Sequence, residues 1–136
     1  MPIRKKILFV CVENAGRSQM AEGFLRKYGR RFEAISAGTA PSHILNPMVI
    51  DVMGEIGVDI TNQEPKMLSN DMVMNSAKAV NMGCMDKESC PSLFVGDVLN
   101  WNIPDPKGKT IDEVRAIRDQ IESKVLALIK TLEDDL

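Results

Sequence analysis

Apolar runs and polar segments alternate along this chain, and the spacing of the apolar residues predicts strands and helices in turn. Residues 6–10, 32–37 and 77–82 are short and almost continuously apolar. This pattern is typical of strands that are buried on both faces of a sheet. A shorter apolar run at 93–95 predicts a fourth strand.

Helices are predicted wherever apolar residues lie three and four positions apart. The expected helices span residues 17–29, 47–57, 67–76 and 110–132. The segment 67–76 is the ambiguous one, and we expect only a short helix there. Thr110 and Glu113 have the spacing of a capping box, which marks the start of the last helix. Strands that alternate with helices predict an α/β protein with a parallel sheet covered on both faces.

Composition limits the class of protein. The chain has 136 residues, of which 44% are apolar and 26% charged, so we expect one domain, residues 1–136. A net charge of −2 favours neither nucleic acid nor a membrane surface as a partner. No apolar run approaches the roughly 18 residues of a membrane span, and residues 7–10 are too short for a signal-peptide core. We therefore expect a cytoplasmic protein.

The chain has three cysteines, Cys11, Cys84 and Cys90. An odd number of thiols in a cytoplasmic protein argues against a disulfide scaffold. Zinc held by the three thiols and His43 is disfavoured, because no two of these residues have the close spacing of metal ligands. Cys84 and Cys90 are therefore either unrelated thiols or members of a redox relay, since thiol–disulfide exchange needs thiolates within reach of one another.

Cys11 ends the first predicted strand and opens a loop of five residues before Arg17 and Ser18. Ligands of parallel α/β sheets bind beyond the carboxyl ends of the strands, and a helix N-terminus attracts anions. We expect the loop to surround a tetrahedral oxyanion. The oxyanion-binding residues expected are Val12, Glu13, Asn14, Ala15, Gly16, Arg17 and Ser18. Neither the glycine spacing of a dinucleotide loop nor the Gly-Lys pair of a Walker loop is present.

Each residue type in this loop suits that chemistry. The helix N-terminus favours the thiolate of Cys11, to which Ser18 can donate a hydrogen bond. The planar fork of Arg17 can bind two oxygens of the anion. Asn14 tolerates a left-handed backbone, and Gly16 adopts geometries that other residues resist. The plainer alternative is a buried core cysteine with an arginine nearby by chance.

Residues 9–22 resemble the low-molecular-weight protein tyrosine phosphatase superfamily, and the segment 18–22, Ser-Gln-Met-Ala-Glu, resembles its arsenate reductase branch. Residues 36–39 and 46–47 match further segments of the family. The resemblance implies a flavodoxin-like three-layer sandwich with a four-stranded parallel sheet. It also implies that Asn14 is held by Ser36, and that a potassium ion lies near Asn14, Glu22 and Ser36.

The resemblance further implies that Asp105 is the general acid, although an Asp-Pro pair alone indicates only a turn. Lys107 stands where the phosphatases tend to carry a tyrosine that binds phosphotyrosine, which weakens a phosphotyrosine role. Thioredoxin-coupled arsenate reductases carry a cysteine pair like Cys84 and Cys90. The resemblance thus implies reduction of arsenate to arsenite by a relay of Cys11, Cys84 and Cys90.

This predicted enzyme needs no metal or organic cofactor, acts as a monomer, and takes its electrons from thioredoxin or a similar protein. The alternative enzyme is a phosphomonoester hydrolase that uses Cys11, Arg17 and Asp105 alone. A third hypothesis is a sensor of oxyanions or arsenic without catalysis, which has no use for an acid such as Asp105.

Overall fold

The computed structural model describes residues 4–83 and 98–135. Along the chain the elements are β1 (Lys5–Cys11), α1 (Arg17–Tyr28), β2 (Phe32–Gly38), α2 (Pro47–Glu55), α3 (Asn70–Met74), β3 (Lys78–Asn81), β4 (Val98–Asn100) and α4 (Ile111–Asp134). The short helix expected within 67–76 is present as α3. The strand expected at 93–95 lies outside the described residues, and the strand that follows β3 in the structure is β4.

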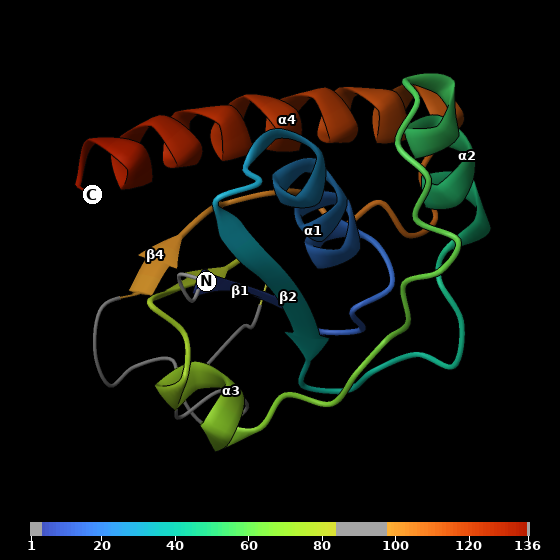
Figure 1. Ribbon diagram of the computed structural model, residues 1–136. Coiled ribbons are helices and arrows are strands. Elements are labelled where there is room, and N and C mark those ends of the chain that lie inside the picture. The colour runs from blue at the N-terminus through green and yellow to red at the C-terminus, as the bar shows by residue number, and fades with distance from the viewer. Residues whose placement is uncertain (1–3, 84–97, 136) are drawn as a thin grey trace.

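The four strands pair in parallel in the order β2-β1-β3-β4 (Figure 1). In this register Cys11 at the end of β1 lies opposite Gly38 at the end of β2, and Val10 lies opposite Asn81 at the end of β3. The carboxyl ends of the strands therefore meet at one edge of the sheet. This is the edge at which parallel α/β proteins bind ligands.

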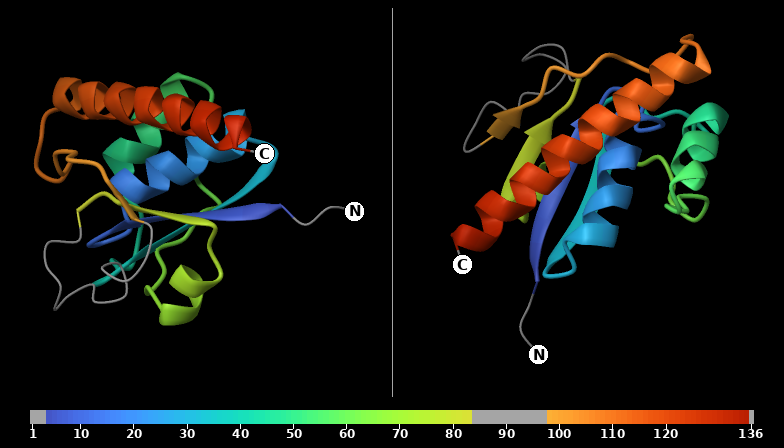
Figure 2. Two further views of the ribbon diagram at one scale, coloured as in Figure 1. Left: turned by 90° about the vertical axis from the view of Figure 1, so that its left-hand side faces the viewer. Right: turned by 90° about the horizontal axis from the view of Figure 1, so that it is seen from above.

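Helices cover both faces of the sheet, with α1, α2 and α4 on one side and α3 on the other (Figures 1 and 2). Side chains of β1 alternate between two cores because successive residues of a strand point to opposite faces. Ile7, Phe9 and Cys11 belong to the larger core, which includes residues of α1, α2 and α4, whereas Leu8 and Val10 belong to the smaller core beside α3. The predicted three-layer α/β fold with a four-stranded parallel sheet is confirmed.

The last helix starts as its sequence predicts. The Thr110 hydroxyl accepts a hydrogen bond from the Glu113 backbone N–H at 3.2 Å, and the Glu113 carboxylate accepts one from the Thr110 N–H at 3.0 Å. Both halves of the capping box are thus formed. Within the described residues, no helix combines the length and apolar character needed to cross a membrane.

Candidate active site

The candidate site is built on the turn from β1 into α1, which we call the anion loop (residues 12–16). Cys11, the last residue of β1, is only 2% exposed, and Arg17 is the first residue of α1. Gly16 is the N-cap of α1, where no side chain caps the helix. The Gly16 backbone, at φ −135° and ψ −89°, lies outside the main regions open to residues with a Cβ. The first N–H groups of the helix therefore remain available to an anion.

Hydrogen bonds turn the carbonyl groups of the anion loop outward. The carbonyl oxygens of Val12, Glu13 and Ala15 accept hydrogen bonds from backbone N–H groups of residues 40–46, at 2.8, 2.9 and 2.9 Å. Within the described part of the chain, the backbone N–H groups of residues 12–17 have no acceptor. Such an array of N–H groups is an anion-binding concavity.

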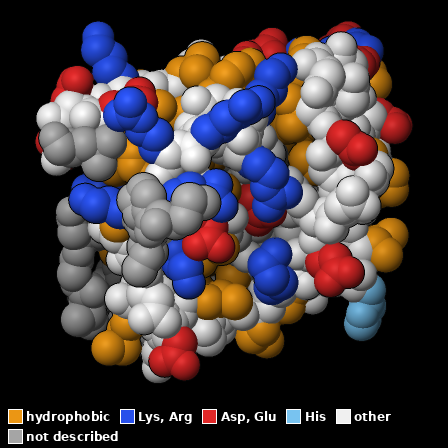
Figure 3. Space-filling model, viewed as in Figure 1, with side chains coloured by type: hydrophobic (Ala, Val, Ile, Leu, Met, Phe, Trp, Pro, Cys, Tyr) orange, Lys and Arg blue, Asp and Glu red, His pale blue; other side chains and the backbone are white. Residues whose placement is uncertain are grey.

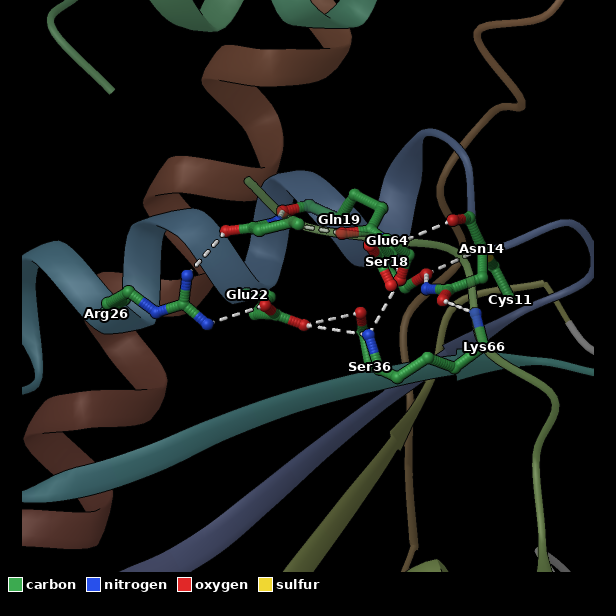
Figure 4. A network of polar contacts seen from close by, with 10 residues as sticks. Cys11, Asn14, Ser18, Gln19, Glu22, Arg26, Ser36, Glu64 and Lys66 are labelled. Atoms are coloured by element: carbon green, nitrogen blue, oxygen red, sulfur yellow. Dashed lines mark hydrogen bonds and ion pairs between the residues drawn. The ribbon is translucent and has the colours of Figure 1, made fainter. Parts of the chain in front are cut away.

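Asn14 holds the middle of the anion loop (Figure 4). It is fully buried, with a left-handed φ of 51°. Its Oδ1 accepts a hydrogen bond from the Lys66 backbone N–H at 2.8 Å, and its Nδ2 donates to Ser18 Oγ at 2.7 Å. Ser18 Oγ lies 2.8 Å from Cys11 Sγ. Because the Ser18 oxygen already accepts from Asn14, its own hydrogen is free to point at the sulfur, where it stabilises a thiolate.

Two glutamines brace the anion loop from behind, and the sequence analysis did not single them out. Gln19 Nε2 donates to the Asn14 carbonyl oxygen at 2.9 Å, and Gln63 Nε2 donates to Gln19 Oε1 at 2.8 Å. Both side chains are buried. Within the described residues no buried side-chain nitrogen or oxygen lacks a hydrogen-bond partner. A polar network satisfied in this way is rigid.

The expectation that Ser36 holds Asn14 is wrong. Ser36 Oγ donates instead to Glu22 Oε1 at 2.6 Å, while Ser18 and Lys66 bind the Asn14 side chain. The physical reason is the negative charge of the Glu22 carboxylate, which attracts the Ser36 hydroxyl. A buried carboxylate such as Glu22, whose side chain is 4% exposed, attracts every donor within reach more strongly than a neutral amide does.

The surroundings of Glu22 also decide against the potassium ion that the resemblance implies. Arg26 Nη2 lies 2.7 Å from Glu22 Oε2, and the Lys66 ammonium lies 3.9 Å from Glu22 Oε1. These cationic side chains already compensate the carboxylate, so the residues present do not fit a further cation. Within the described residues, no cluster of His, Cys, Asp and Glu could hold a metal ion.

Arg17 is placed by parts of the chain that are remote in sequence. Its Nη1 donates to the Ile103 carbonyl oxygen at 3.2 Å, and its Nη2 lies 3.7 Å from Asp105 Oδ2. The guanidinium also lies against Gly83, where a Cβ would collide with it. Gly83 and Ile103 thus position Arg17, which is only 9% exposed. Neither residue has a sequence signal of this role.

Residues 102–108, which we call the acid loop, carry Asp105 to the anion loop. Asp105 has a 54% exposed side chain, and the Pro106 ring packs so closely on Gly16 that a Cβ there would lie 2.8 Å from Pro106 Cγ. Cys11, Arg17 and Asp105 all line one small cavity of about 30 Å³. The three residues proposed for catalysis from the sequence therefore meet at one site.

The remaining sequence candidates are Cys84, Cys90 and His43, of which the structure describes only His43. Cys84 and Cys90 lie outside the described ranges. His43, the one histidine of the chain and hence the pale blue side chain in Figure 3, is exposed on the surface. It does not line the cavity that Cys11 lines.

A cysteine and an arginine at the two ends of an anion loop, on the ligand-binding edge of an α/β sheet, are the arrangement expected of a cysteine-dependent enzyme of tetrahedral oxyanions. The model of the low molecular weight phosphotyrosine protein phosphatase family matches residues 6–136, and the chain belongs to this family.

Known relatives include arsenate reductases. One from Bacillus cereus is 37% identical over 137 residues, covering 98% of this chain and 100% of the relative. The solved structure of an arsenate reductase in its phosphate-binding state has a TM-score of 0.83 and 29% identity, covering 93% of this chain and 98% of that one. A thioredoxin-dependent arsenate reductase of Corynebacterium glutamicum has a TM-score of 0.83 and 32% identity, covering 98% of this chain and 64% of that one.

Proposed function

We propose that this protein reduces arsenate to arsenite. The observation that carries the proposal is the meeting of Cys11, Arg17 and Asp105 at one cavity, beside loop N–H groups that have no acceptor within the described residues. Relatives that are themselves arsenate reductases cover nearly the whole chain and support it. Arsenate and phosphate are both tetrahedral oxyanions, so this geometry alone admits either.

In the first step the Cys11 thiolate attacks arsenic, and an oxygen of arsenate leaves as water. Arg17 and the loop N–H groups bind the remaining oxygens and stabilise the charge that develops on them. Asp105 is the acid that protonates the leaving oxygen. The Ser18 hydroxyl, 2.8 Å from the sulfur, is placed to donate a hydrogen bond to the attacking sulfur.

In the second step the Cys84 thiolate attacks the Cys11 sulfur. A Cys11–Cys84 disulfide forms, the sulfur–arsenic bond breaks, and its electron pair reduces arsenic to arsenite. Cys90 then attacks Cys84, which frees Cys11 and leaves a Cys84–Cys90 disulfide for a thioredoxin-type protein to reduce. Gly83, which precedes Cys84 in the sequence, packs against Arg17, and this supports Cys84 as the second thiol.

A relay of this kind is consistent with a monomer in the cytoplasm, because one chain supplies every proposed thiol and that compartment reduces disulfides. The second candidate function is phosphomonoester hydrolysis. It is favoured by the same three residues at the cavity, with water replacing Cys84 as the second nucleophile.

Variants of the two remote thiols separate these functions. We expect Cys84→Ser and Cys90→Ser each to stop multiple-turnover arsenite release with thioredoxin, thioredoxin reductase and NADPH. Cys84→Ser should keep any hydrolysis of p-nitrophenyl phosphate, and Cys90→Ser should accumulate a Cys11–Cys84 disulfide, measured by mass spectrometry after alkylation. If both variants reduce arsenate at the wild-type rate, the relay is wrong and the phosphatase is preferred.

A further inference from the structure

The acid loop and the anion loop are joined across the mouth of the site by an ion pair that the proposed chemistry does not use. Lys107 Nζ donates to Glu13 Oε1 at 2.9 Å. The carboxylate of Glu13, through this hydrogen bond, raises the pKa of Lys107. We call this Glu13–Lys107 ion pair the rim pair.

The rim pair lies at the entrance of the cavity rather than at its base. Glu13 and Lys107 line the same cavity as Cys11, Arg17 and Asp105. Their side chains are 40% and 69% exposed, whereas Cys11 and Arg17 are buried. A ligand that reaches Cys11 from solvent therefore passes beside the rim pair.

Further contacts couple the rim pair to the proposed acid. The Lys107 backbone N–H donates to Asp105 Oδ1 at 3.0 Å, and the Pro106 ring between these residues packs on Gly16. The ion pair of Lys107 with Glu13 thus keeps the acid loop close to the anion loop. The cavity between the two loops is narrow as a result. Opening of the rim pair would let the acid loop move outward from Gly16.

The size of the cavity decides which ligands this closed arrangement favours. The cavity measures about 30 Å³. A cavity of roughly 10–15 Å³ holds one water molecule, whereas an engineered cavity known to bind benzene measures roughly 150 Å³. A small inorganic oxyanion suits this narrow site, but the organic group of an ester must project past the rim, which Glu13 and Lys107 line.

We propose that the rim pair is a specificity determinant, which favours inorganic oxyanions such as arsenate and phosphate over their organic esters. The choice of arsenate rests on the proposed function, but the discrimination between free and esterified oxyanions does not. Because exposed ion pairs are weak, removal of the rim pair should change the discrimination by about two- to fivefold.

Binding of two probes to unmodified enzyme tests this directly. Inorganic phosphate and phenylphosphonate should each protect Cys11 from iodoacetamide when they occupy the site, and peptide mass spectrometry measures the protection of Cys11 alone. The ratio of the two Kd values reports discrimination. This binding measurement requires no turnover, so its result does not depend on whether the protein reduces arsenate.

We expect Lys107→Gln to improve phenylphosphonate binding relative to phosphate by about two- to fivefold. The double variant Glu13→Gln, Lys107→Gln should do the same without a change in net charge. The exchanged pair, Glu13→Lys with Lys107→Glu, should restore a ratio near that of the wild type. Lys109→Gln is the matched control, because Lys109 does not line the cavity.

Two outcomes overturn the proposal. One is a wild-type ratio in both Lys107→Gln and the double variant. The other is a ratio in the exchanged pair that stays as altered as in the double variant, which would show that the individual side chains, rather than their pairing, set the preference.

Discussion

The two loops that form the site are held in opposite ways. In the anion loop Asn14 is fully buried and its side-chain amide binds both Ser18 and Lys66. In the acid loop Asp105 is half-exposed, and its contact with Arg17 is a long ion pair of 3.7 Å. Buried hydrogen bonds thus fix the middle of the first loop. In the second loop Ile103 and Pro106 are buried, but the proposed acid itself lies at the surface.

The difference between the two loops matches their proposed roles, since the anion loop binds the oxyanion and the acid loop supplies the proton. An oxyanion-binding array works best when its donors are already in place, because they then need no reorganisation during the reaction. A proton donor on an exposed loop can approach and withdraw, which suits a site that must admit substrate and release product. Substitution of the buried Asn14 should therefore affect both folding and activity, and substitution of the half-exposed Asp105 should affect activity alone.

The largest expected effect is that of Cys11→Ser. A serine hydroxyl is not ionised at neutral pH, so both arsenate reduction and ester hydrolysis should fall below detection. Protection by phosphate against thermal unfolding should remain, because the loop N–H groups and Arg17 are unchanged. Substantial turnover by this variant would refute Cys11 as the nucleophile.

Asp105→Asn tests the acid loop. The amide cannot donate the proton of a carboxylic acid, so we expect the rate to fall by about a hundred- to thousandfold. The melting temperature should stay close to that of the wild type, because the side chain is exposed and a surface substitution rarely exceeds about 0.5 kcal/mol. A large loss of stability would contradict the contrast between the loops.

Arg17→Lys keeps a positive charge but loses the planar fork. We expect a loss of about a hundredfold in kcat/KM, which is the usual effect of removing one transition-state donor. The matched control is Arg26→Lys, since Arg26 is mostly exposed and lies outside the cavity. Equal kinetics of the two variants would show that Arg17 does not bind the anion.

Asn14→Ala should lower both the free energy of unfolding and the activity. It removes both hydrogen bonds of the amide and leaves a Cβ residue in the left-handed region. We expect about 2 kcal/mol of destabilisation and about a tenfold loss of activity. Asn102→Ala, in the exposed acid loop, should change the melting temperature little. If calorimetry gives similar values for both, the two loops do not differ in rigidity.

The smallest effect on kcat/KM is expected when the potassium ions of the assay buffer are replaced by another cation. Arg26 and Lys66 already compensate Glu22 behind the anion loop. Replacing potassium chloride by choline chloride at equal ionic strength should therefore change kcat/KM by less than about twofold, the residual scale of screened surface charge. Activation of severalfold by potassium would show that the loop needs a bound ion.

Local patterns in the sequence predicted the fold and the identity of the central residues. Continuous apolar runs marked β1, β2 and β3, and the capping box marked the start of α4. The strand–loop–helix setting of Cys11 and Arg17 predicted their place because it depends on neighbours in the chain. The resemblance to a family was needed for Asp105, since an Asp-Pro pair alone indicates only a turn.

The contact of Ser18 with Cys11 was predicted from the sequence, but the tertiary structure alone decided which distant groups support these residues. Asn14 binds Lys66 across 52 positions of the sequence, Arg17 binds Ile103 across 86, and Glu13 binds Lys107 across 94. Ser36, expected at Asn14, pairs with Glu22 instead. Such partners depend on how distant loops pass one another and on which buried charge attracts a donor most strongly, and no local pattern of residues records either.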